Sequence, residues 1–262
     1  MTKTLLGDKI LKTVIWMALI LLWTAVSIIA SQLVVGYLML AILGKETFSE
    51  PMPTAVFSAL FYVLAMALII FVPPLLKKCW NKNHNTAKEK LTLPSRTELG
   101  LKDLPTWTDI GLAPVGYLVY LVLGMAVTSL FSLFPWFDVN QAQDVGFSTY
   151  MAGGEKVIAF ITLVVIAPIA EEIIFRGWLY GKIRNKLSQS MTNLVSMIVS
   201  ALLVSVLFGA IHLQWNVGVN VFALSLVLCA LREITGTIYS GILLHMFKNG
   251  LAFYLLYVVG IS

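Results

Sequence analysis

Residues 187–231 read LSQSMTNLVSMIVSALLVSVLFGAIHLQWNVGVNVFALSLVLCAL, and these 45 residues contain no Asp, Glu, Lys or Arg. A helix needs about 20 apolar residues to cross the hydrocarbon core of a bilayer. The stretch is therefore long enough for two membrane-spanning helices, with a break expected in the polar segment HLQWNVGVN at 212–220. Paired charge-free helices of this length indicate an all-α membrane protein.

The composition of the whole chain supports the same fold class. Of its 262 residues, 59% are hydrophobic and 12% are charged, whereas soluble globular domains have roughly 45–50% apolar and about 25% charged residues. The chain has too few polar side chains to cover a water-exposed surface, and too many apolar ones to remain disordered. We therefore expect an all-α, polytopic bundle of transmembrane helices.

Seven spans are predicted, and the pattern allows a range of six to eight. Three further stretches without any charge, at 13–44, 51–76 and 110–137, provide the first three spans. Two more apolar runs carry charges in their interior and complete the set. The expected spans lie at about 14–43, 54–76, 112–134, 157–180, 192–212, 217–231 and 236–259.

The formal net charge of +5 is interpreted as an orientation signal, and no nucleic-acid partner is expected. Lys and Arg gather at the N-terminus, between the second and third spans and after the fourth, while the alternate loops carry mainly acidic residues. The positive-inside rule then predicts a multi-pass protein of the cell membrane with a cytoplasmic N-terminus and, for seven spans, an external C-terminus. Membrane lipids are the expected contacts of the basic loops, and the oligomeric state stays open.

The fourth predicted span, VIAFITLVVIAPIAEEIIFRGWLY at 157–180, contains two glutamates and an arginine. Charges inside a span cost about 2.5–3.5 kcal/mol each at the bilayer centre, so a functional site is the first hypothesis for them. Glu172 and Arg176 are four residues apart and can pair on one helical face. Structural support is the favoured interpretation of that pair. Glu171 points about 100° away from Glu172 and has no partner in its own helix.

The fifth and seventh spans also carry polar side chains in apolar surroundings. Phe208 and His212 share a helical face in FGAIH at 208–212, and His245 and Asn249 share one in HMFKN at 245–249. Such side chains seldom face lipid, because their hydrogen-bonding groups would be unsatisfied there. Lys248 also lies inside the seventh span, and we expect it to reach the membrane surface or to pair with a carboxylate such as Glu172.

A helical hairpin would bring the fourth and fifth spans together. Residues equally far from the turn of an antiparallel hairpin stand opposite each other. The midpoint between Glu171 and His212 falls between Met191 and Thr192, within a polar, turn-like segment. A carboxylate and an imidazole are therefore expected to meet inside the membrane.

The candidate catalytic residues are Glu171, His212, His245 and Asn249. A carboxylate and a histidine beside a water can remove its proton and later return it to a leaving amine. A second histidine and an asparagine can donate hydrogen bonds to the oxyanion of a tetrahedral intermediate. Such a set hydrolyses an amide without a cofactor, which is the first choice here. Alternatively, His212, His245 and Glu171 could bind zinc with one position open, although the chain has no HExxH helix.

Three motifs carry a family resemblance. EEIIFR at 171–176 fits the pattern EExxxR, FGAIH at 208–212 fits FxxxH, and HMFKN at 245–249 fits HxxxN. In this order and on separate spans, they resemble the motifs of the CAAX-protease and bacteriocin-processing (CPBP/Abi) family of intramembrane proteases, which includes the Ras-converting type of CAAX prenyl protease. The resemblance covers about residues 157–257.

The resemblance implies roles for individual residues. Glu171 would activate the water with His212 as its partner, and His245 with Asn249 would form the oxyanion site. The supporting residues would be Glu172, Arg176 and Phe208. The implied activity is that of an endopeptidase acting on membrane-associated or lipid-anchored peptides. These would be CAAX-type tails, or bacteriocin or signal peptides in processing or immunity.

The basic loop at 77–109 is the one candidate linker in the chain. Residues 1–110 would form N-terminal transmembrane helices plus this basic cytoplasmic loop, and residues 111–262 a transmembrane catalytic bundle with the family-like core at about 157–257. Two alternatives are kept. One is a non-catalytic scaffold or chaperone of the same family. The other, less favoured, is a small ion-coupled transporter, because transporters usually contain repeated halves and this chain shows no repeat.

Overall fold

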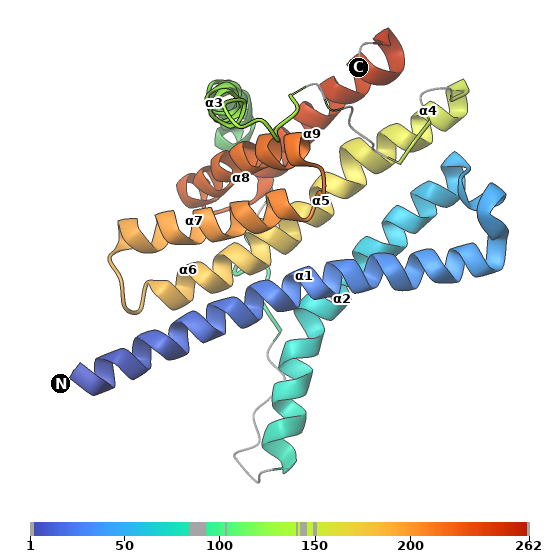
Figure 1. Ribbon diagram of the computed structural model, residues 1–262. Helices are drawn as coiled ribbons and strands as arrows, with labels where there is room; N and C mark the ends of the chain where they lie inside the picture. The colour runs from blue at the N-terminus through green and yellow to red at the C-terminus, as the bar shows by residue number, and fades with distance from the viewer. Residues whose placement is uncertain are drawn as a thin grey trace.

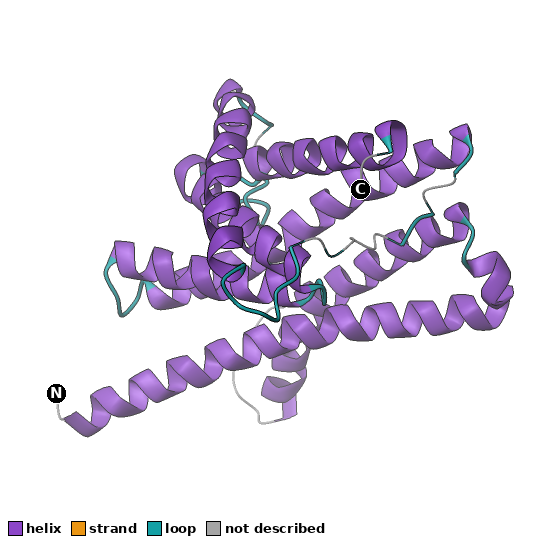
Figure 2. Cartoon of the chain, turned by 45° about the horizontal axis from the view of Figure 1, so that its top comes forward, coloured by secondary structure: helices purple, strands orange, loops and turns teal. Residues whose placement is uncertain are grey.

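The computed structural model describes residues 3–83, 93–102, 104–139, 141, 146–148 and 151–260. Within these ranges every regular element is a helix (Figure 2). Seven helical runs in the described residues are long and apolar enough to cross a membrane: Gly7–Phe48, Pro51–Cys79, Trp107–Phe131, Gly153–Leu187, Asn193–Ala210, Trp215–Thr235 and Tyr239–Val259. The predicted all-α fold with seven spans is confirmed, and the chain is a multi-pass membrane protein.

Two long helices form an N-terminal hairpin, α1 (Lys3–Phe48) and α2 (Pro51–Asn83). Gly44 adopts a φ of 75°, outside the helical region, so α1 is kinked just before the hairpin turn. α2 changes direction in its second half, as Figure 1 shows, and contains Pro73 and Pro74. Prolines explain the bend because they lack the N–H of the helical hydrogen bond and their rings clash with the preceding turn.

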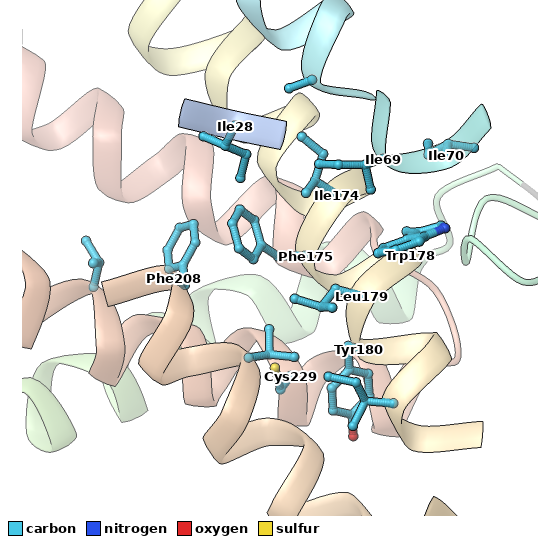
Figure 3. Close-up of a cluster of buried hydrophobic side chains, with 14 of the residues drawn as sticks. Ile28, Ile69, Ile70, Ile174, Phe175, Trp178, Leu179, Tyr180, Phe208 and Cys229 are labelled. Carbon is cyan, nitrogen blue, oxygen red and sulfur yellow. The ribbon is translucent and has the colours of Figure 1, made fainter. Parts of the chain in front are cut away.

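This hairpin packs against the fourth span through apolar side chains. Ile28 of α1 and Ile69 of α2 belong to one buried cluster with Ile174 and Phe175 of the fourth span (Figure 3). Ile69 and Ile174 are 0% and 1% exposed. The N-terminal helices are thus continuous with the core of the bundle.

The fourth span is one continuous helix that alternates between α and π geometry, seen in yellow in Figure 1. Its segments are α4 (Gly153–Phe160), η1 (Ile161–Ile166), α5 (Ala167–Glu172), η2 (Ile173–Tyr180) and α6 (Gly181–Leu187). Turns with i→i+5 hydrogen bonds are rare in proteins, and those that occur often lie at functional sites. Here the two π segments flank α5, which carries both glutamates.

Pro168 has a specific consequence in this helix. The N–H of Ala167 donates to the carbonyl of Thr162, five residues earlier. The next amide in the same register would bond the carbonyl of Leu163, but Pro168 has no N–H to donate. The Leu163 carbonyl is therefore free to accept a hydrogen bond from another helix.

The next two helices complete a tight antiparallel arrangement. α7 (Asn193–Ala210) returns beside α6 after a turn at 188–192, where the Thr192 side chain caps α7, and α8 (Trp215–Thr235) follows (Figure 1). A Cβ added at Gly209 would lie 2.7 Å from the carbonyl oxygen of Gly218. Only glycine allows α7 and α8 to approach this closely, as small residues do between membrane helices.

A buried carboxylate joins the third span to the last one. α3 (Trp107–Phe131) packs on α8 and on α9 (Tyr239–Phe253), which continues as η3 (Tyr254–Val259). Asp109, 2% exposed, accepts hydrogen bonds from the hydroxyls of Thr237 at 2.7 Å and Ser240 at 2.8 Å. The first turn of α3 thereby fixes the start of α9.

We expect Asp109→Ala to lower the free energy of unfolding by about 1.5–3 kcal/mol, the contribution of hydrogen bonds to a charged group. The substitution leaves the buried hydroxyls of Thr237 and Ser240 without their acceptor. Chemical unfolding of the purified protein in detergent micelles measures the change. Asp8→Ala, at an exposed position of α1, is the matched control. Equal stabilities of the two variants would contradict a role for Asp109 in joining α3 to α9.

Candidate active site

Glu172 and Arg176 form an ion pair at the centre of the bundle. The Nη1 of Arg176 lies 2.9 Å from the Oε1 of Glu172, and both side chains are 0% exposed. The predicted i, i+4 pair is confirmed. The guanidinium also lies over the ring of Phe208, with its carbon 4.4 Å from the ring centroid, so the face of the cation is covered by an aromatic ring.

Glu172 also contacts the seventh span. Its Oε1 lies 3.1 Å from the Nδ1 of His245. An ionised carboxylate only accepts, so Nδ1 is the donor and Glu172 fixes the orientation of the imidazole. A Cβ added at Gly241 would lie 3.0 Å from the Oε2 of Glu172. Glycine one turn before His245 therefore makes room for the carboxylate against α9.

Glu171 points to a different part of the bundle. Its Oε2 lies 3.7 Å from the Nε2 of His245, and its side chain is 15% exposed, while Glu172 is 0% exposed. The Oε1 of Glu171 accepts a hydrogen bond of 2.5 Å from the hydroxyl of Tyr62 on α2. Of the two adjacent glutamates, Glu171 is thus the one that a reactant can reach.

Tyr62 is the site residue that the sequence did not reveal. It is one of nine tyrosines and lies in a span without charges. Nothing in its neighbourhood along the chain marks it, since its partner is 109 residues away. Only the packing of α2 on α5 brings the two side chains together.

His212 lies just beyond the end of α7. Its Nδ1 is 2.7 Å from the carbonyl oxygen of Phe208. A carbonyl only accepts, so Nδ1 carries the hydrogen and Nε2 keeps a lone pair. No hydrogen bond joins the described side chains of His212 and Glu171, but Glu171, Lys248 and His245 all lie within electrostatic reach of the imidazole. The hairpin therefore brings His212 to the site without direct contact with Glu171.

Asn249 uses part of its amide for a structural contact. Its Nδ2 donates to the carbonyl of Leu163 at 2.9 Å, which is the carbonyl that Pro168 leaves unbonded. The amide group has a second N–H, and the oxyanion role stays a prediction for it.

Lys248 was expected to reach the membrane surface or to pair with a carboxylate such as Glu172. Among the described residues, the Oε1 of Glu172 contacts Arg176 and His245. The carboxylate whose charge acts on Lys248 is that of Glu171. The cation is therefore part of the surroundings of the accessible glutamate.

A metal site was considered for His212, His245 and Glu171. Across the described parts of the chain, no three His, Cys, Asp or Glu side chains are grouped so that they could hold a metal ion. Among the described residues, His212, His245 and Glu171 are therefore not gathered into such a group.

The fold and the site together define a class: a polytopic helical membrane protein with a carboxylate–histidine cluster between its spans. Residues 153–251 match the family described as type II CAAX prenyl endopeptidase Rce1-like. The match covers the segment with all three motifs and confirms the predicted resemblance. Searches of curated proteins and of solved structures gave no match.

We expect Arg176→Met to destabilise the protein by about 3–5 kcal/mol, because it leaves the buried charge of Glu172 unpaired. Unfolding in detergent measures the loss, with Arg96→Met at an exposed position as the control. Adding Glu172→Gln to Arg176→Met should recover part of the stability. A double variant less stable than Arg176→Met alone would refute the ion-pair explanation.

Proposed function

We propose that the chain is an intramembrane endopeptidase that hydrolyses peptide bonds in membrane-associated or lipid-anchored peptides. The observation that carries this proposal is the partly exposed carboxylate of Glu171, 3.7 Å from the Nε2 of His245 and within electrostatic reach of His212. A carboxylate that a reactant can reach inside a bundle suits a general base. The match of residues 153–251 to an endopeptidase family supports the same reaction.

The proposed reaction needs one water and no covalent nucleophile. Glu171 takes a proton from the water as its oxygen attacks the carbonyl carbon, which gives a tetrahedral intermediate with a negatively charged oxygen. Collapse of the intermediate breaks the C–N bond, and the proton held by Glu171 passes to the leaving nitrogen. The products are a carboxylic acid and an amine, and Glu171 is ionised again.

The histidines and the asparagine support these steps. The Nε2 lone pair of His212 accepts a hydrogen bond from the attacking water and orients it. His245 is held at Nδ1 by Glu172 and forms the oxyanion site together with Asn249. Asn249 contributes the amide hydrogen that Leu163 does not use. Donors placed before the reaction stabilise the intermediate because they need no reorganisation.

The site lies on membrane-spanning helices, which limits the substrates. Glu171 is within the span Gly153–Leu187, and His245 is within Tyr239–Val259. A scissile bond must therefore be carried to the bilayer by an apolar segment or a lipid anchor. CAAX-type tails fit this requirement, as do bacteriocin or signal peptides. The basic loops support a cytoplasmic N-terminus and an external C-terminus.

We expect Glu171→Gln to reduce cleavage by about 100-fold or more, because it removes the base and keeps the shape of the side chain. Membrane-derived peptides from cells with wild type or Glu171→Gln are compared by mass spectrometry at equal protein level. Peptides that accumulate uncut only in the variant identify the substrate. Glu46→Gln makes the same chemical change at an exposed position and should leave the peptides unchanged.

An identical peptide inventory in the Glu171→Gln cells, together with an intact cellular phenotype, would refute proteolysis and favour a scaffold. Ion flux in proteoliposomes that depends on Glu171 would instead favour a transporter.

We also expect cleavage to survive metal removal. The carboxylate and imidazole groups supply the proton transfers themselves, so 1,10-phenanthroline should change the rate in isolated membranes less than about twofold. A loss of activity with the chelator that added zinc reverses would contradict the metal-free mechanism.

A further inference from the structure

We infer that Tyr62, on a helix outside the family-matched segment, is a positioning residue for Glu171. The inference rests on the proposed function and adds a residue from residues 1–110 to the site. Its basis is the hydrogen bond of 2.5 Å from the Tyr62 hydroxyl to the Oε1 of Glu171. No described carboxylate other than Glu171 contacts this phenol.

The contact between the Glu171 carboxylate and His245 is longer than a hydrogen bond. The Oε2 of Glu171 is 3.7 Å from the Nε2 of His245, beyond the usual distance of a hydrogen bond. Tyr62 therefore provides the one close hydrogen bond to this carboxylate among the described residues. A glutamate has three side-chain torsions, so without this donor the carboxylate can rotate away from the reacting position.

Tyr62 is itself held firmly. Its ring lies 4.1 Å from that of Phe61, centroid to centroid, and Phe61 is 7% exposed in a cluster with residues of α1. In the same region, α2 packs on the core of the fourth span through Ala65 and Ile69, both 0% exposed. The phenol is thus a fixed donor on a rigid helix, as positioning of a catalytic group requires.

Through Tyr62, the N-terminal hairpin contributes a hydrogen-bond donor to the site. Residues 153–251 contain Glu171 and both histidines, but the group that fixes the Glu171 carboxylate comes from α2. The reaction is therefore expected to need α2 for geometry as well as for stability.

The test compares wild type with Tyr62→Phe, which removes one oxygen atom and keeps the ring. Tyr120→Phe is the matched control, because Tyr120 is also buried and its hydroxyl also donates to a side-chain oxygen, that of Asn220 on α8. We expect Tyr62→Phe to reduce cleavage of the peptides that accumulate with Glu171→Gln by about tenfold or more, the effect of a misplaced catalytic group. Tyr120→Phe should stay within about twofold of wild type.

A second readout does not depend on the substrate. Dicyclohexylcarbodiimide is an apolar reagent that modifies carboxyl groups within membranes, and mass spectrometry locates the adduct in the full-length protein in liposomes. We expect Tyr62→Phe to increase the rate of modification at Glu171 roughly 3–10-fold, as the loss of one hydrogen bond allows. Glu172 is 0% exposed and serves as the internal reference.

The outcomes separate the inference from the proposed function. Wild-type cleavage and wild-type labelling in Tyr62→Phe would overturn the inference while loss of cleavage in Glu171→Gln upholds the protease. Increased labelling of Glu172 as well would also overturn it, since Tyr62 would then act on stability alone. Faster labelling confined to Glu171 supports the inference, and cleavage that survives Glu171→Gln would reject the proposed function instead.

Discussion

The ion pair between Glu172 and Arg176 is the interaction around which the bundle is organised. Two charges that are fully buried among membrane-spanning helices depend on each other for compensation. Phe208 covers the cation, His245 donates to the anion, and Gly241 leaves room for it. The fourth, fifth and seventh spans are fixed relative to one another by these contacts. The preceding residue, Glu171, takes no part in this pair and is the more exposed of the two glutamates.

The sequence predicted features that follow from regular helix geometry. Charge-free lengths gave the seven spans, and the i, i+4 spacing gave the Glu172–Arg176 pair. Contacts between distant helices could not be predicted, because hydropathy gives the length of a span but not its neighbours. Tyr62 was missed for this reason, and the surroundings of Lys248 could not be predicted either. The division at residue 110 stays a prediction, although the Tyr62 contact crosses it.

The segment shared with the endopeptidase family is only part of the structural unit. Residues 153–251 carry the three motifs, yet two contacts that place their side chains come from earlier helices. Asp109 of α3 holds the turn that begins α9, and the hydroxyl of Tyr62 on α2 bonds Glu171. The side chains of the three motifs can therefore be supported by helices whose sequences carry no family motif, because support requires only packing and a well-placed polar atom.

The contact between Asn249 and the Leu163 carbonyl has a consequence for how the chain can evolve. Pro168 removes a hydrogen-bond donor from one helix, and the Asn249 amide on another replaces it. The two residues are 81 positions apart, and the donor that one lacks is supplied by the other. A mutation that restored an N–H at position 168 would make this one hydrogen bond of the amide redundant, whereas losing the amide first would leave the Leu163 carbonyl unpaired within the bundle. For this hydrogen bond alone, a change of the proline before the asparagine avoids an unpaired carbonyl.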